Sequence, residues 1–224
     1  MSLQGWSALV LAAGASQRFG AAKMLAPLAG APLIRRTGQQ ICAAGFGETI
    51  IVTGAHHDAI ADALDGLDCR IVHAQGWREG MAASLRTGIA AVSSKSAGVF
   101  VFLGDMPLVP LHLCPQLALL ATGAGFAARP VVAGKPGHPA CLTRAAFDDL
   151  AKLEGDSGAA RLIARRGSGV AYLAVEDEGA LIDIDAPCDL AVAERAWNLR
   201  ATSATSESAI SRGDLPNPSR PIGA

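Results

Sequence analysis

Two cationic side chains follow a glycine-containing stretch near the start of the chain, where they could neutralise a bound anion. The stretch VLAAGASQRFGAAK, residues 10–23, leaves an apolar run, passes Gly14 and Gly20, and carries Arg18 and Lys23. Glycines let the backbone approach a ligand closely, and arginine and lysine are the usual partners of phosphate. The pattern predicts a loop whose amides surround a polyphosphate while the two cations offset its charge.

Spacing excludes the two most familiar phosphate loops. A P-loop has four residues between its glycines and a lysine directly after the second, whereas five residues separate Gly14 from Gly20 and two alanines precede Lys23. The dinucleotide fingerprint fails because Ser16 stands where its second glycine should be, which argues against a dinucleotide oxidoreductase.

Carboxylates at two further places could hold a metal ion beside such a polyphosphate. Asp105 follows the apolar run GVFVFLG, and Mg²⁺ prefers one or two carboxylates together with phosphate oxygens and water. The alternative for Asp105 is a cap or turn residue before Pro107. In DIDAP, Asp183 and Asp185 alternate with isoleucines on a predicted strand, so both point to one face. Asp183 could equally be structural.

The elements that must position these residues alternate between strands and helices. Apolar runs at 7–12, 48–54, 69–74 and 98–105 predict strands buried on both faces, and helical spacing appears at 32–45, 56–66 and 80–92. This order predicts an α/β fold: a three-layer α/β/α sandwich around a mostly parallel, Rossmann-like sheet.

The second half of the chain is less regular. We expect strands at 125–132, 138–143 and 170–175, helices at 144–153 and 159–167, and a strand, a proline turn and a closing helix within 180–197. The remainder is rich in Ser, Pro and Gly, so we expect one domain over residues 1–200 and a disordered tail over residues 201–224.

Composition excludes several function classes. The net charge is −1 and aromatics make up 4% of residues, so neither a basic surface nor a stacking platform for nucleic acid is expected. No apolar run is long enough to cross a bilayer, and no cation precedes the first one, as a secretory leader requires. The five cysteines form no CxxC pair and are expected to be free thiols. We expect a cytoplasmic protein without nucleic-acid or membrane partners.

The opening motif resembles the signature loop of the nucleotidyltransferases, and more narrowly that of the molybdenum cofactor cytidylyltransferases, a MobA-like group. The loop LAAGASQRFG with its lysine is joined by GDMP at 104–107, GHP at 137–139 and DIDAP at 183–187. WREGMAASL at 77–85 and GDSGAARLI at 155–163 also resemble segments of that family. Together the motifs span roughly residues 6–198.

The resemblance implies transfer of CMP from CTP to the phosphate of a molybdenum-pterin, with pyrophosphate released and Mg²⁺ as cofactor. A molybdoenzyme or its chaperone is a possible protein partner. The implied catalytic residues are Arg18, Lys23 and Asp105, and the implied metal ligands are Asp105 and Asp185. The implied nucleotide-binding residues are Leu11, Ala12, Ala13, Gly14, Ser16, Arg18, Lys23, Gly80, Ser84 and Gly104. The implied acceptor-binding residues are His138 and Asp156.

The choice of CTP depends on the opening loop. The sister family that uses GTP has glycine where this chain has Ala13, and a Cys-Asp pair where it has Gly104-Asp105. A methyl group at Ala13 takes up room beside the base and should favour the smaller pyrimidine.

Two other functions stay open. A nucleotidyltransferase for a sugar phosphate or another small alcohol phosphate would share the loop and the carboxylates, although GHP and GDSGAAR favour the pterin branch. A nucleotide-binding protein without turnover is the second alternative, and the joint presence of both cations and both carboxylates argues against it. Taken alone, the segment at 80–92 could be an ordinary amphipathic helix, and His138 a packed or solvated side chain.

Overall fold

A single twisted sheet runs through the computed structural model, which describes residues 2–16 and 19–210 and the side chains up to residue 200. Its eight strands follow the order β10-β7-β9-β6-β1-β4-β5, with β8 paired to β7, and a separate hairpin joins β2 to β3. The sheet strands are β1 (Ser7–Ala12), β4 (Glu48–Thr53), β5 (Arg70–His73), β6 (Gly98–Leu103), β7 (Ala127–Val132), β8 (Lys135–Pro136), β9 (Ala140–Thr143) and β10 (Val170–Ala174); the hairpin strands are β2 (Pro27–Leu28) and β3 (Ala31–Pro32).

The strands that carry the site motifs are parallel and lie at the centre of the sheet. β1 pairs in parallel with β4 on one side and β6 on the other. β9 runs antiparallel to both β6 and β7, and β10 is parallel to β7, so the sheet is mixed. Because β1 and β6 are adjacent and parallel, the loop after β1 and Asp105 after β6 meet at the same sheet edge.

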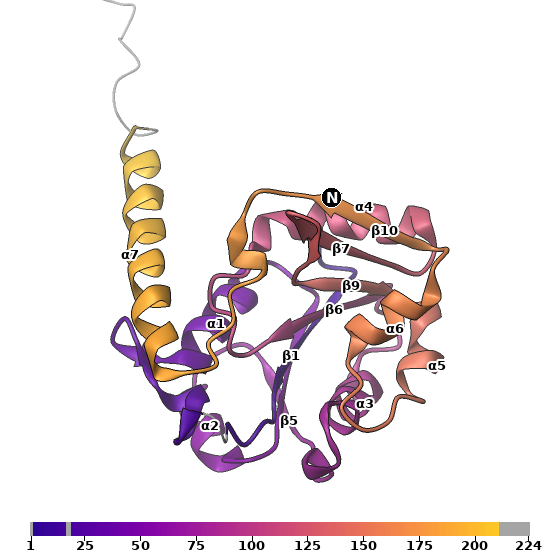
Figure 1. The fold of residues 1–224 in the computed structure, drawn as a ribbon, viewed down its shortest axis with the longest axis horizontal. Coiled ribbons are helices and arrows are strands. Elements are labelled where there is room, and N and C mark those ends of the chain that lie inside the picture. Colours follow the sequence, from indigo (N-terminus) through magenta and orange to yellow (C-terminus); the bar gives the residue numbers. More distant parts are fainter. Residues whose placement is uncertain (1, 17–18, 211–224) are drawn as a thin grey trace, which may run out of the picture.

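Helices cover both faces of the sheet, so the predicted three-layer α/β fold is confirmed (Figure 1). One apolar cluster joins the sheet to α1, α2 and α4, and a second joins its other face to α3, α5 and α6. These helices are α1 (Leu33–Ala43), α2 (His57–Ala63), α3 (Met81–Ala91), α4 (Cys114–Ala124), α5 (Phe147–Leu150) and α6 (Ala159–Arg166).

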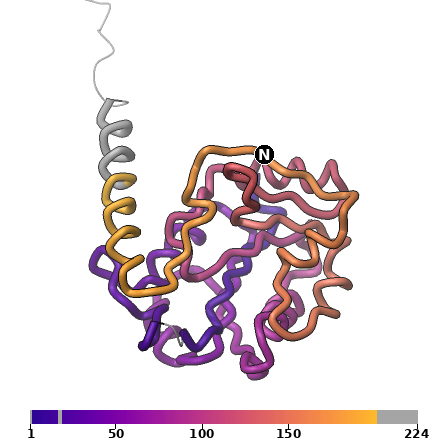
Figure 2. Tube along the Cα trace, in the orientation of Figure 1, coloured from indigo at the N-terminus to yellow at the C-terminus, as the bar shows by residue number. Residues whose placement is uncertain are grey.

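The last helix, α7 (Pro187–Ile210), stands along one side of the body. The stretch between β10 and α7 crosses the molecule before the helix begins (Figure 2). A third apolar cluster, which includes Leu33, Leu108, Ile184 and Ala193, attaches the start of α7 to α1 and to the segment after β6. The expected boundary at residue 200 falls inside α7, and residues 211–224 of the expected tail lie outside the described residues.

One expectation about local structure was wrong, and one helix was missed. The segment 181–186 forms no ladder with the sheet; the Ile184 amide instead donates one hydrogen bond of 3.1 Å to the Asp105 carbonyl. Its alternating pattern arises because Ile184 is buried in the α7 cluster while Asp183 is exposed. Helix α4 was not predicted at all, because its sequence CPQLALLATGA has no clear polar face.

Candidate functional site

A cavity of about 780 Å³ lies at the carboxyl ends of β1 and β6. It is bordered by residues from the loop after β1, from the start of α3, and from the segments that carry Asp105, Asp156 and Asp185. The residues that line it are Leu11, Ala13, Gly14, Ala15, Ser16, Phe19, Lys23, Met24, Trp77, Arg78, Gly80, Met81, Ser84, Leu103, Asp105, Asp156 and Asp185. Most residues predicted for nucleotide, acceptor and metal binding therefore come together, although Arg18 lies outside the described residues.

Lys23 joins the two predicted metal ligands at the base of this cavity. Its Nζ atom lies 2.7 Å from Asp105 Oδ2 and 3.3 Å from Asp185 Oδ1. Lys23 is buried, whereas a lysine in a loop is usually exposed. Burial acts to lower the pKa of Lys23, but the charges and hydrogen bonds of Asp105 and Asp185 together raise that pKa above its ordinary value of 10.5. Lys23 is therefore charged at neutral pH.

The remaining oxygen of Asp105 offers a position for a cation. Asp105 Oδ1 is buried and has no hydrogen-bond partner among the described residues, which is costly unless a ligand completes it. The described residues contain no cluster of three or more His, Cys, Asp or Glu side chains that could enclose a metal ion. Two carboxylates beside an open cavity suit Mg²⁺, which keeps water and phosphate oxygens in its coordination shell.

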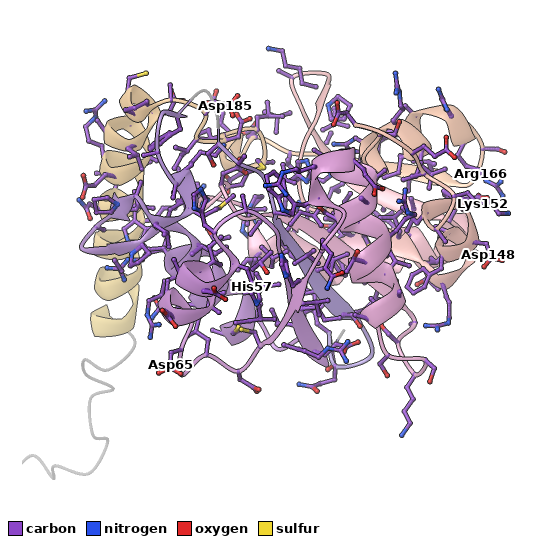
Figure 3. The ribbon with its side chains drawn as sticks, turned by 90° about the horizontal axis from the view of Figure 1, so that it is seen from below. His57, Asp65, Asp148, Lys152, Arg166 and Asp185 are labelled. Carbon is purple, nitrogen blue, oxygen red and sulfur yellow. The ribbon has the colours of Figure 1, made fainter. Side chains whose placement is uncertain are left out.

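Backbone hydrogen bonds place Asp185 opposite Asp105. The amides of Asp185 and Ala186 donate to Asp189 Oδ2 at 2.9 and 2.7 Å, which fixes the turn before α7. These bonds lower the pKa of Asp189 below its ordinary value. In Figure 3, Asp185 lies beside α7, across the molecule from Lys152 and Arg166. Asp189 is a positioning residue that the sequence reasoning missed, although an acid just inside a helix start is a usual signal.

Asp183 stays apart from this cluster. Its side chain is exposed and does not line the cavity. Burial of part of the carboxyl and the nearby charges of Asp185 and Asp105 raise the pKa of Asp183. Of the two aspartates in DIDAP, only Asp185 therefore lines the cavity together with Asp105.

The start of α3, in the GMAASL segment, forms another wall of the cavity. Gly80 precedes the helix with φ 110° and ψ −179°, a conformation that is essentially restricted to glycine. The amide of Ala82 donates to the Gly155 carbonyl at 3.0 Å, so the loop that carries Asp156 is held against this helix start. Gly80 permits that contact, because a Cβ there would lie 2.5 Å from the Gly155 backbone.

We expect Gly80→Ala to lower the melting temperature, because strain at this backbone conformation costs roughly 1–3 kcal/mol and the added methyl displaces the 155–156 loop. Gly123→Ala is the matched control, since nothing lies within 4 Å of a Cβ at that helical position. The control should be neutral or slightly stabilising. Thermal unfolding measures both variants, and equal melting temperatures would contradict the role assigned to Gly80.

Among the predicted site residues that the structure describes, three do not line the cavity: Ala12, Gly104 and His138. The Gly104 amide donates to the Leu11 carbonyl at 2.9 Å and its carbonyl accepts from Thr37 Oγ1 at 3.0 Å. A Cβ on Gly104 would come within 3.2 Å of Ala12 Cβ. Gly104 and Ala12 thus hold β6 close to β1, one layer behind the cavity wall.

His138 lies just before β9, an interior strand of the sheet, and its amide donates to the Ala180 carbonyl at 2.8 Å. Burial, and then the charge of Arg129, lower its pKa to about 4, so the imidazole is neutral at pH 7. Its Nδ1 atom is buried without a hydrogen-bond partner among the described residues. Its role toward an acceptor stays a prediction.

Trp77 is the most prominent lining residue that the sequence reasoning did not select. It packs partly against the α3 face of the core, and the Arg78 guanidinium lies 4.4 Å from its ring centroid. Gly54 lets it approach, because a Cβ there would lie 2.6 Å from both Trp77 Cβ and the Ala13 carbonyl. An aromatic residue shortly before the GM segment was the available signal, and an indole on this wall suits a planar ring.

The chain is similar to a known domain family, to curated relatives and to solved structures. The MobA-like NTP transferase domain matches residues 8–170. Molybdenum cofactor guanylyltransferase of Cereibacter sphaeroides is 34% identical over 192 residues, which cover 83% of this chain and 94% of that protein. Nicotine blue oxidoreductase of Paenarthrobacter nicotinovorans is 27% identical over 188 residues, which cover 79% and 90%. The structure of Rv0371c from Mycobacterium tuberculosis H37Rv in complex with manganese is similar with a TM-score of 0.68 and 28% identity, over 82% of this chain and 95% of that one.

Proposed function

Because the chain belongs to the MobA-like NTP transferase family, we propose that it transfers a nucleotidyl group, CMP from CTP, to the phosphate of a molybdenum-pterin. One observation carries the proposal: Lys23, Asp105 and Asp185 meet in a single cavity with the loop after β1. The relative named as a molybdenum cofactor guanylyltransferase supports the pterin acceptor. We also propose that a molybdoenzyme or its chaperone receives the product.

The proposed step is a substitution at phosphorus. An oxygen of the acceptor's phosphate attacks the α-phosphorus of the triphosphate, a new P–O–P bond forms, and the bond to the β-phosphate oxygen breaks. The electron pair leaves with pyrophosphate. The acceptor brings its own ionised nucleophile, so the step needs positioning and charge neutralisation more than a protein base.

The chain's own residues would supply both the positioning and the charge neutralisation. Backbone amides at Gly14–Ser16 lie where they can face the triphosphate, and Lys23 supplies a positive charge beside it. Asp105 and Asp185 would hold Mg²⁺, which neutralises charge on the phosphate oxygens when it is bound. The start of α3, with Ser84 on the cavity wall, is placed to orient the nucleoside. Arg18 would add a second cation.

The identity of the nucleotide base is the more specific part of the proposal, and cytosine and guanine are the two candidates. Ala13 is buried and lines the cavity, so its methyl group narrows the space beside the loop and supports a pyrimidine. The name of the Cereibacter relative favours GTP as the second candidate. The name of the Paenarthrobacter relative is not carried over, since this loop lacks the dinucleotide glycine pattern.

Pyrophosphate release tests the reaction and the acceptor together. Purified protein with Mg²⁺ is given each of the four triphosphates and either molybdenum-pterin or a small set of sugar and alcohol phosphates. We expect release only when the pterin is present. Turnover with a sugar phosphate instead would move the protein to the alternative acceptor class, and no turnover with any pair would contradict an enzymatic function.

We expect Ala13→Gly to narrow the preference for CTP over GTP, because removing the methyl group opens the space beside the base. Steric differences of this size change discrimination by about 1–3 kcal/mol. Steady-state kcat/KM values for both triphosphates measure it, with Ala15→Gly as a control on the same loop. An unchanged CTP/GTP ratio in Ala13→Gly would show that Ala13 does not select the base.

A further inference from the structure

A protein cation already bridges two of the carboxylates that line the cavity, those of Asp105 and Asp185. Lys23 Nζ is within 3.3 Å of one oxygen on each of Asp105 and Asp185, and the Lys23 and Asp105 side chains are only 9% and 17% exposed. Lys23 is the first residue of the short helix η2 (Lys23–Leu25), which follows the loop after β1. The charge of this pair of carboxylates is thus partly satisfied before any ligand binds.

A lysine in this place competes with a divalent cation for the same oxygens. Like charges a few ångströms apart and shielded from water repel strongly, so an ammonium and a dication cannot both approach the two carboxylates without cost. The buried Asp105 Oδ1 shows that the carboxylate can accept more than Lys23 offers. The carboxylates therefore favour binding of a metal ion, while the charge of Lys23 disfavours it.

We propose that Lys23 is a resident counter-cation that keeps divalent metal out of the Asp105–Asp185 site until a triphosphate binds. A triphosphate in the cavity brings several negative charges next to Lys23, which gives the ammonium a second partner and releases carboxylate oxygens. Metal and nucleotide would then bind together rather than one after the other. The inference rests on the proposed function, since it takes a triphosphate as the ligand of this cavity.

Binding of Mn²⁺ tests the inference without turnover. The free-ion electron paramagnetic resonance signal of Mn²⁺ is titrated with wild-type protein, alone and with the non-hydrolysable analogue α,β-methylene-CTP. The same titration is run on Lys23→Met, which keeps an unbranched side chain only one atom shorter and removes its charge. We expect weak binding by the wild type alone, and at least about tenfold tighter binding by Lys23→Met alone. With the analogue, the wild type should bind one Mn²⁺ beyond what the free analogue takes up.

Two control variants test whether the change in Mn²⁺ binding arises at Asp105 and Asp185. Lys95→Met removes the charge of an exposed lysine and should leave Mn²⁺ binding unchanged. Lys23→Met combined with Asp105→Asn should lose the gained binding, which places the ion at these carboxylates. If Lys23→Met does not fold, Lys23→Gln is used in its place. If neither variant folds, the inference is tested by comparing Mn²⁺ binding of the wild type with and without the analogue.

Tight one-to-one Mn²⁺ binding by the wild type without nucleotide would overturn the inference, as would Lys23→Met binding no better than wild type. Both results are independent of cytidylyl transfer. A protein that fails to release pyrophosphate can still show the expected Mn²⁺ pattern, and an active enzyme can fail to show it.

Discussion

Replacing Asp105 by asparagine is expected to lower turnover by at least about a thousandfold while the fold stays intact. Asp105 faces the cavity at the end of β6, pairs with Lys23 at 2.7 Å and presents a second, buried oxygen that lacks a partner among the described residues. The asparagine side chain keeps the shape but removes the negative charge that pairs with Lys23 and that would hold the proposed metal ion. Loss of such charge stabilisation is worth several kcal/mol in the transition state, and about 4 kcal/mol corresponds to a thousandfold.

Asp183→Asn is the matched control for this variant. The two aspartates belong to segments that meet, but Asp183 is exposed and does not line the cavity. We expect less than a tenfold loss of rate and a wild-type melting temperature for Asp183→Asn. Asp105→Asn should still fold but melt at a lower temperature, because Lys23 then keeps only Asp185 as a charged partner. Single-turnover rates at saturating substrates decide the comparison. If Asp105→Asn keeps more than about a tenth of the wild-type rate, Asp105 does not act in the chemical step.

Replacing Lys23 by methionine is expected to cost at least about a hundredfold in turnover and also to lower the melting temperature. Its charge lies beside the expected triphosphate, and removing a cation from a transferring phosphoryl group typically costs a few kcal/mol. Removal also leaves Asp105 and Asp185 facing each other without a counter-charge. Because Asp185 is 46% exposed, we expect a stability loss on the order of 2 kcal/mol rather than the larger cost of a fully buried pair.

Two further measurements separate the effect of Lys23→Met on turnover from its effect on stability: the variant Lys23→Arg, and the addition of Mn²⁺ to Lys23→Met. Arginine keeps the charge but presents a planar fork, so partial recovery of stability without full recovery of rate is expected. Mn²⁺ should raise the melting temperature of Lys23→Met, because the ion replaces the missing counter-charge. A Lys23→Met enzyme with near-wild-type kcat would show that the lysine serves only the fold.

The central fold could be predicted because its signals are local. The runs that form β1, β4 and β6 are short, apolar on both faces and separated by segments with helical spacing, so strand, helix and layer order followed from pattern alone. The contact of Lys23 with Asp105 was not predicted: it depends on the strand order of the sheet, in which β1 and β6 are parallel neighbours whose following loops share an edge. The resemblance, rather than periodicity, selected Asp185.

Other features depend on contacts that a pattern cannot show. DIDAP alternates like a strand, but Ile184 is placed by the α7 cluster and by one bond to Asp105, not by a neighbouring strand. Lys23 looks like a surface residue in a loop until two distant carboxylates, one of them 162 positions away, close over it. Trp77 reaches the cavity because Gly54 leaves room for it, which is a property of three-dimensional packing.

The function proposed here is tested most directly by offering the enzyme equal concentrations of CTP and GTP with Mg²⁺ and molybdenum-pterin, and weighing the dinucleotide product by mass spectrometry. We expect pterin carrying CMP to exceed pterin carrying GMP by at least about tenfold, the ratio of the two kcat/KM values. Equal amounts, or an excess of the GMP product, would contradict cytidylyl transfer while leaving nucleotidyl transfer intact; no dinucleotide of either kind would contradict nucleotidyl transfer to this acceptor.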